Sequence, residues 1–262
     1  MREDLFNNLL PVHGEPVDPV AMARRDLKKA LPKRFYKEAR AEWREGAFAL
    51  TLDGKPARTP GRNAIALPTQ AAGDAVAAEW AGQGEHIEPW TMPMTRIVNS
   101  ALDGVVWDME PVRDEIVKYA GTDLLCYRAG EPDSLVAAQA VAWDPVLERA
   151  RETLRAEFLV GTGIQFIQQP EAAIEAVRRA VAAVRAPLPL AALNVMTTIT
   201  GSAILALGVA GGWLSAEAAW AAAHVDEDFQ IRAWGADEEA SARRAGRWLE
   251  MSAAARLYAL TS

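Results

Sequence analysis

The chain has 262 residues, of which half are hydrophobic and about a quarter are charged, so it is long enough for one large or two medium domains. Its net charge of −7 argues against nucleic acid or an anionic membrane surface as the partner, because both are bound through basic faces. The single cysteine, Cys126, excludes an intrachain disulfide and fits a reducing compartment.

The beginning of the chain is acidic and lacks the apolar core of a secretory signal. It is also too acidic for a mitochondrial transit peptide, so we expect a bacterial protein of the cytoplasm. Residues 1–32 combine four prolines with many charges, and we expect them to form a flexible arm with a short helix near residues 20–30.

Residues 34–68 are typical of a small antiparallel meander. The best strand is 47–52, and the Asp53-Gly54 pair that follows it is a strong hairpin signal. The returning segment 55–60 contains two prolines, which confine it to an edge of the sheet. Thr69 then caps a helix over 70–81, with Ala72, Val76, Ala77 and Trp80 on its core face.

The rest of the chain has mainly helical signals. We expect helices over 112–120, 133–143, 145–158, 170–184, 217–234 and 236–260, with a short extended piece near 122–128. The predicted class is therefore α+β: a β-rich domain over residues 33–115, followed by an all-helical domain over 116–262.

The longest uncharged stretch, residues 186–216, raises the question of a membrane span. Two prolines open it, three glycines close it, and Thr, Asn and Ser side chains interrupt it. We therefore interpret it as the helix at the centre of the helical domain, around which later helices pack.

The expected helix over 217–234 places a carboxylate on an aromatic face. At 100° per residue, Trp220, Glu227 and Trp234 share one stripe, which Asp226 and Asp228 flank. An unpaired carboxylate is costly to bury. Either an Arg or Lys of the same chain meets Glu227, or a group from a partner does.

The side chains that could carry chemistry do not form a recognised catalytic or metal site. His13, His86 and His224 lie in different expected elements, and Cys126 is flanked by apolar residues, so we expect neither a metal ion nor a nucleophilic thiol. No glycine-rich stretch has the spacing of a phosphate or dinucleotide loop, so we expect no cofactor. Paired carboxylates among 226–228 and 237–239 are the remaining catalytic option, although neighbours on a helix point in different directions.

Four stretches together resemble the F1-ATPase assembly chaperone family, whose mitochondrial members are the ATP synthase assembly factor 2 proteins. They occur in the family's order between about Arg34 and Tyr258. They are Arg34-Phe35-Tyr36 with Leu52-Asp53-Gly54-Lys55-Pro56 and Thr59-Pro60; Ala78-Glu79-Trp80 with Met92-Pro93-Met94-Thr95; Thr122-Asp123-Leu124-Leu125-Cys126-Tyr127-Arg128 with Trp143-Asp144-Pro145; and Asp226-Glu227-Asp228-Phe229-Gln230-Ile231 with Trp234-Gly235.

The resemblance implies a holding chaperone, without enzymatic activity, that binds the unassembled α subunit of F1 and later yields it to the β subunit. It implies that Glu227 matches a functionally important glutamate of the family, and Trp80 a tryptophan whose loss impairs family members. We expect the partner-binding side chains to be Glu227, Asp226, Asp228, Trp220, Gln230 and Trp234. Trp80, Asp123 and Arg128 are expected to be structural, and the free protein a monomer.

Two other classes of function stay open from the residues alone. A carboxylate-using hydrolase or a small-molecule binder would have its site at the domain junction, lined by Trp80, Trp90 and Glu227. A structural component of a larger complex would differ from a chaperone only in its partner.

Overall fold

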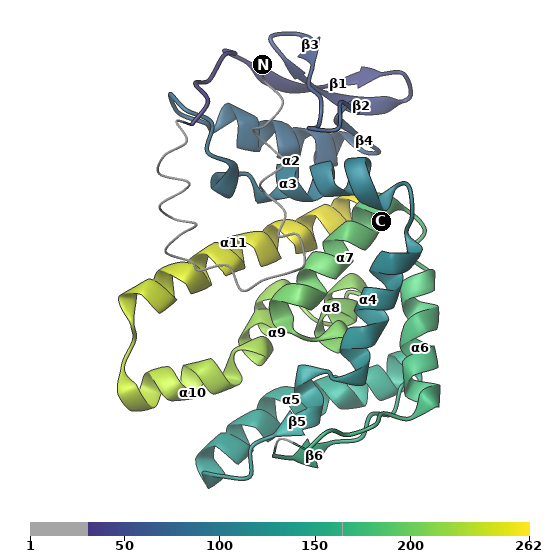
Figure 1. Cartoon of the computed structure of the whole chain (residues 1–262), viewed down its shortest axis with the longest axis vertical. Helices are drawn as coiled ribbons and strands as arrows, with labels where there is room; N and C mark the ends of the chain where they lie inside the picture. Colours follow the sequence, from purple (N-terminus) through teal and green to yellow (C-terminus); the bar gives the residue numbers. More distant parts are fainter. Residues whose placement is uncertain (1–30, 164) are drawn as a thin grey trace. The chain divides into compact units, whose positions relative to one another are not determined.

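The structure, a computed structural model, describes residues 31–163 and 165–262 and forms two compact units, one up to Thr95 and one from Arg96 (Figure 1). The predicted helix near 20–30, and all but the last two residues of the predicted arm, lie outside the described residues. The predicted α+β class is confirmed, since one small antiparallel sheet precedes all ten α-helices of the described chain. The expected domain boundary after residue 115 falls inside helix α4 (Glu110–Gly121), whereas the units divide before Arg96.

The first unit contains the predicted meander. Strands β1 (Ala39–Arg44) and β2 (Ala47–Leu52) form an antiparallel hairpin, and β2 also pairs with β3 (Lys55–Pro56) and β4 (Ala66–Leu67). Asp53 and Gly54 both have positive φ, 49° and 74°, as the two central residues of a tight hairpin turn require. The strand expected over 55–60 is shortened to two residues, because proline cannot donate to the ladder.

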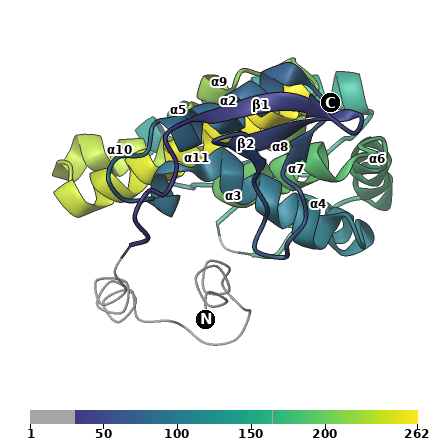
Figure 2. The same ribbon diagram turned by 90° about the horizontal axis from the view of Figure 1, so that it is seen from above.

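Helix α2 (Gln70–Ala81) covers one face of this sheet, and the two lie side by side in Figures 1 and 2. The helix has the predicted bounds, and the side chain of Thr69 accepts a hydrogen bond from the Ala72 amide, 3.2 Å away. Gly73 allows a close approach, since a Cβ there would lie 2.8 Å from the Cβ of Ala41.

Hydrogen bonds connect the sequence motifs of the first unit. The Asp53 carboxylate accepts from the amides of Lys37 and Glu38 at 3.0 and 2.9 Å. The Glu79 carboxylate accepts from the amides of Met94 and Thr95, both at 2.7 Å, and so caps α3 (Pro93–Ser100), a helix that the sequence did not predict. These motifs are therefore pairs of a carboxylate and the backbone donors that it satisfies.

Two helices, α7 (Pro187–Thr200) and α8 (Ala203–Ala210), form the centre of the second unit. The prediction of a single helix in the uncharged stretch was wrong: Gly201 has φ +65° and ends α7, and the Ser202 side chain caps α8 by accepting from the Leu205 amide at 3.0 Å. The expected packing is confirmed, because α7 contacts α4, α8, α9 (Ala216–Ala223) and α11 (Glu238–Thr261). None of the described helices has both the length and the apolar character that a membrane crossing would need.

Other elements surround this centre. Residues Ala101–Val105 form a π-helical turn, α6 covers Glu171–Ala182, and short strands β5 (Tyr127–Arg128) and β6 (Gly161–Thr162) pair in parallel. The two helices expected before and after Asp144 are one continuous helix, α5 (Asp133–Leu154), with Pro145 inside it. Pro145 cannot donate to the carbonyl four residues earlier, but that residue, Val141, is 78% exposed, so water can satisfy its carbonyl.

The expected helix over 217–234 is divided at His224. Helix α9 (Ala216–Ala223) ends there, α10 (Val225–Trp234) begins immediately afterwards, and α11 (Glu238–Thr261) completes the chain. His224 has φ −117° and ψ 18°, outside the helical region, so α9 and α10 do not share one helical wheel.

Candidate functional site

Helix α10 and the first half of α11 have almost no part in the core. Not one residue from Val225 to Glu250 is buried, whereas Met251, Ala254 and Leu257 further along α11 are. In both views this pair of helices lies at one end of the second unit (Figures 1 and 2). An ordered segment that contributes little to the core is available for contact with another molecule.

The sequence explains why these helices form without a core. Three acidic residues occupy the first turn of α10 and Arg232 its last turn, which complements the helix dipole. Gly235, with φ +90°, ends α10, and the Asp237 side chain caps α11 by accepting from the Ala240 amide at 2.7 Å.

Two of the three acidic side chains of α10 are bonded within the unit. The Asp226 carboxylate accepts from Gln139 Nε2 of α5 at 2.7 Å, and the buried Gln139 carbonyl accepts from the Ala129 amide at 2.8 Å. The Asp228 carboxylate forms an ion pair with Arg244 of α11. These bonds fasten α10 to its neighbours from two sides.

Glu227, between them, has no comparable partner. Its carboxylate Oε2 lies 3.7 Å from His224 Nε2, which is too long for a hydrogen bond. His224 Nδ1 lies 2.7 Å from the Trp220 carbonyl, which can only accept, so this nitrogen carries the proton. Burial lowers the pKa of His224 below its ordinary value, so at pH 7 the ring is neutral and its Nε2 has no proton to donate.

Arg244 is also near Glu227, but its hydrogen bond goes to Asp228. Among residues 31–163 and 165–262, no Lys or Arg forms an ion pair with Glu227. The Glu227 side chain is 39% exposed. It therefore presents a negative charge to solvent, beside a buried imidazole, and accepts no hydrogen bond from the described residues.

The structure does not bring the aromatic side chains of the expected stripe together. Trp220 belongs to α9, where its ring lies 3.8 Å from the His224 ring and 5.4 Å from that of Trp248 on α11. Trp234, at the far end of α10, is 89% exposed. Gln230 is exposed on the same helix. Of the two tryptophans, only Trp220 is linked to Glu227, through the His224 ring that lies against it.

The three residues expected to be structural are buried or nearly so. Trp80 is a core residue of the first unit, where the hydroxyl of Tyr36 donates to its carbonyl at 2.7 Å. Asp123 is fully buried and accepts from the amides of Leu125 and Ile204, at 3.2 and 3.1 Å. Burial raises its pKa to about 6, against the opposing effect of these hydrogen bonds.

The Arg128 side chain, only 9% exposed, pairs with Asp144 at 2.9 Å and lies over the Trp143 ring. The indole of Trp143 in turn donates to the Ala222 carbonyl of α9 at 2.7 Å. This chain of contacts connects the motif at Arg128 to the helix that precedes α10.

Sequence reasoning missed the residues that support α10 from a distance. Gln139 and Arg244 lie 87 and 16 positions from their partners, and neither has a local pattern that identifies it. His224 carried a usable signal, because it comes just before three acidic residues, the usual composition of a helical first turn.

Cys126 is buried, and burial raises the pKa of its thiol to about 12, so the group stays protonated and unreactive at neutral pH. Within the described ranges, no three His, Cys, Asp or Glu side chains come together in a way that could hold a metal ion. The carboxylates of α10 are thus the prominent polar feature of the second unit's exposed end.

Comparisons with known proteins agree with this picture. The sequence model of a family described as ATP12 chaperone protein matches residues 33–151. The crystal structure of Atp12 from Paracoccus denitrificans is 39% identical, with a TM-score of 0.81, and the match covers 88% of this chain and 99% of that one.

Two further relatives extend the comparison. The Atu1473 protein of Agrobacterium tumefaciens, described as a candidate chaperone, is 44% identical with a TM-score of 0.85, over 95% of this chain and 93% of that one. The mitochondrial protein atp12 of Schizosaccharomyces pombe is 22% identical over 220 residues, which is 79% of this chain and 75% of the relative. The family resemblance in the four sequence motifs is confirmed, and the chain belongs to the ATP12 chaperone family.

Proposed function

We propose that this protein binds the unassembled α subunit of F1-ATPase through α10, keeps it from aggregating, and yields it to the β subunit as the ring assembles. The observation that carries the proposal is Glu227: a partly exposed carboxylate with no donor among the described residues, on a helix that has no buried residue. A charged group that its own chain leaves without a partner can receive charge-assisted hydrogen bonds from another protein.

The residues around Glu227 hold the proposed binding surface in place before the client binds. Asp226 and Asp228 are bonded to Gln139 and Arg244, so the helix is held in place before the client arrives. A rigid binding surface loses little conformational freedom on association. The exposed Trp234 on the same helix adds an aromatic anchor of the kind that dominates protein interfaces.

Holding and release then follow from mass action. An α subunit without its neighbours exposes apolar surface that is buried in the ring, and such surface promotes aggregation. A chaperone that covers it keeps the free subunit in solution, provided that the final partner binds more tightly and displaces the chaperone. We propose that the protein does this as a monomer in the bacterial cytoplasm.

The family and the Atu1473 protein are described as chaperones, and we infer that this chain acts by binding rather than by catalysis. A hydrolase built on α10 would need two carboxylates facing one substrate. Asp226 and Asp228 are occupied by Gln139 and Arg244, which leaves Glu227 alone. The geometry of α10 therefore favours the chaperone over the hydrolase.

The proposal is tested with the purified α subunit and two charge-reversed variants. Glu227→Lys should weaken binding at least a hundredfold, because it removes an acceptor and opposes the incoming donor. Glu217→Lys is the matched control, since Glu217 is an exposed acid in the first turn of α9 and loses the same helix-dipole interaction. Binding is measured by isothermal titration and the thermal midpoint by circular dichroism.

Equal affinity of Glu227→Lys and Glu217→Lys for the α subunit would contradict the site. A large fall in the melting temperature of Glu227→Lys alone would mean that Glu227 is a structural residue. Failure of the wild-type protein to bind the α subunit at all would overturn the proposed function.

A further inference from the structure

Strand β1 forms a free edge of the sheet in the first unit, and the register shows which of its backbone groups point outward. Strand β1 pairs with β2 on one side only. The Asp53 amide donates to the Glu38 carbonyl at 2.9 Å, which makes this pair a hydrogen-bonded one just before the ladder from Ala39. Since hydrogen-bonded pairs alternate in an antiparallel ladder, the backbone groups of Ala39, Ala41 and Trp43 point away from β2.

No strand of the described residues lies against this edge. An unpaired edge offers a row of amides and carbonyls to any extended chain that reaches it. The edge contains no proline and no bulge between Ala39 and Arg44, so another strand can pair with it in regular register.

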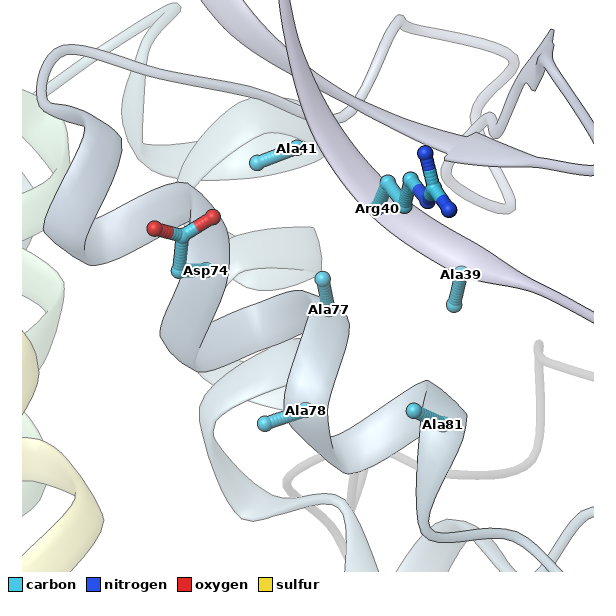
Figure 3. A pocket seen from close by; sticks show the side chains of 7 residues that line it. All are labelled: Ala39, Arg40, Ala41, Asp74, Ala77, Ala78 and Ala81. Carbon is cyan, nitrogen blue, oxygen red and sulfur yellow. The ribbon is translucent and has the colours of Figure 1, made fainter.

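A shallow, open groove of about 340 Å³ runs beside this edge, between β1 and α2 (Figure 3). Small side chains line it on both sides: Ala39 and Ala41 of β1, and Ala77, Ala78 and Ala81 of α2. Ala77 and Ala78 lie four and three residues before Ala81, so the three share one side of the helix. Alanine at all five positions leaves an open apolar surface beside the free edge, against which a further strand can lie.

Two charged residues line the groove, and only one of them has an ion-pair partner among the described residues. Arg40 forms an ion pair with Glu38. Asp74 of α2 is exposed, and in the described part of the chain no Lys or Arg pairs with it. The groove therefore combines an apolar floor with one uncompensated negative charge, and it is complementary to an extended segment that carries a basic residue.

We propose that this groove binds an extended segment of the client, which adds to β1 as a further strand. The inference rests on the proposed function, because it takes the α subunit as the client. The segment's backbone bonds to Ala39 and Ala41, every second side chain is small enough to lie against the alanines, and a Lys or Arg reaches Asp74. Strand addition of this kind takes affinity from main-chain bonds and specificity from alternate side chains.

Trp43 extends the apolar part of this surface. Its side chain is 63% exposed and lies edge-on against the Phe48 ring at 4.9 Å. It follows Ala39 and Ala41 in the same alternating set, so it is on the α2 face of the sheet beyond the alanines. An apolar side chain of the bound segment has this ring as its contact.

The first test places a lysine in the groove. Ala78 is exposed and lies four residues after Asp74, so the lysine of Ala78→Lys pairs with Asp74 and fills the space for the client's basic residue. Ala64→Lys is the matched control, since Ala64 is exposed in the same unit, gains the same charge and neither lines the groove nor lies on the helix of Asp74. We expect Ala78→Lys to bind the α subunit at least tenfold more weakly than wild type, and Ala64→Lys to stay within twofold.

The second test identifies the occupant. A photoreactive benzoylphenylalanine at position 81, with position 71 as the control, is irradiated in the presence of the α subunit. Crosslinks from position 81 to one α-subunit segment that contains Lys or Arg are the expected result. Crosslinks from position 81 to another copy of this protein, or to its own residues, would overturn the inference.

The failures of the two proposals are distinguishable. If Ala78→Lys binds as wild type while Glu227→Lys does not, the groove is not a client site and the proposed function stands. If the wild-type protein does not bind the α subunit, the proposed function is wrong and the groove inference is overturned with it, because its occupant is then wrong as well.

Discussion

Asp123 and Glu227 are both carboxylates next to the beginning of a helix, yet they have opposite surroundings. Asp123 lies at the N-terminus of α8, is fully buried, and uses its two oxygens for the amides of Leu125 and Ile204. Glu227 lies in the first turn of α10, is partly exposed, and has no donor in the described chain. The same chemical group is structural where backbone donors surround it, and available to a partner where they are missing.

The regions around these two acids differ in the same way. Helices α7 and α8 are apolar on nearly every side and are covered by their neighbours, so substitutions there should change stability. The segment from Val225 to Glu250 has no buried residue, so substitutions there should change binding and leave stability nearly intact. Substitutions in the two regions test this division between the interior and the exposed segment.

The largest expected effect is on the interior side. Trp80 is 8% exposed and its ring lies 5.7 Å from that of Tyr36, so Trp80→Ala leaves a cavity in the first unit. We expect a loss of about 3–5 kcal/mol in the free energy of unfolding, as for other large-to-small core substitutions. Urea unfolding followed by circular dichroism measures it, and an unchanged unfolding midpoint would show that Trp80 does not have a packing role.

The second effect concerns Asp123 and pH. Because burial raises its pKa from 3.8 to about 6, the native state keeps a proton between these values that the unfolded state has lost. The free energy of unfolding contributed by this group is therefore highest below pH 4 and falls as pH rises to about 6. The loss is about 3 kcal/mol, from about 1.4 kcal/mol for each unit of pKa difference.

Asp123→Asn isolates this contribution, because asparagine does not titrate. The free energy of unfolding of the wild type minus that of Asp123→Asn should decrease from pH 4 to pH 7, because only the wild type loses stability through this group. Exposed acids whose pKa is lowered, such as Asp53, have the opposite pH dependence but are common to both proteins and cancel in the difference. A difference that stays constant over this range would mean that Asp123 ionises as easily in the native as in the unfolded protein.

The sequence predicted what local signals determine. The bounds of α2 follow from the Thr69 cap and helical spacing, and the meander from the Asp53-Gly54 turn. The division of the uncharged stretch at Gly201 was missed, although glycine followed by a capping serine is a local signal, because apolar residues on every side hid the change of helix. The break at His224 was missed as well, although the three acidic residues at 226–228 are typical of a helical first turn.

The candidate site was predictable only in part. The acidic triplet and its link to a known family could be found in the sequence. Which of the three acids lacks a partner could not, because Gln139 and Arg244 come from other helices. The expected aromatic stripe failed for the same reason: Trp220 and Trp234 share a wheel only if α9 and α10 are one helix.

The smallest expected effect on stability concerns Trp234, an exposed side chain of α10. Trp234 is 89% exposed, so Trp234→Ala should change the free energy of unfolding by less than about 0.5 kcal/mol, in contrast to Trp80→Ala. If α10 is the client surface, the same variant should weaken binding of the α subunit about tenfold, which corresponds to roughly 1.4 kcal/mol at an aromatic anchor.

Trp107→Ala is the matched control, since Trp107 is also in the second unit and 76% exposed but lies outside α10 and α11. Equal affinity of the two variants would mean that exposure alone does not identify the anchor. A loss of affinity confined to Trp234→Ala would show that the segment from Val225 to Glu250, which has no buried residue, recognises the client.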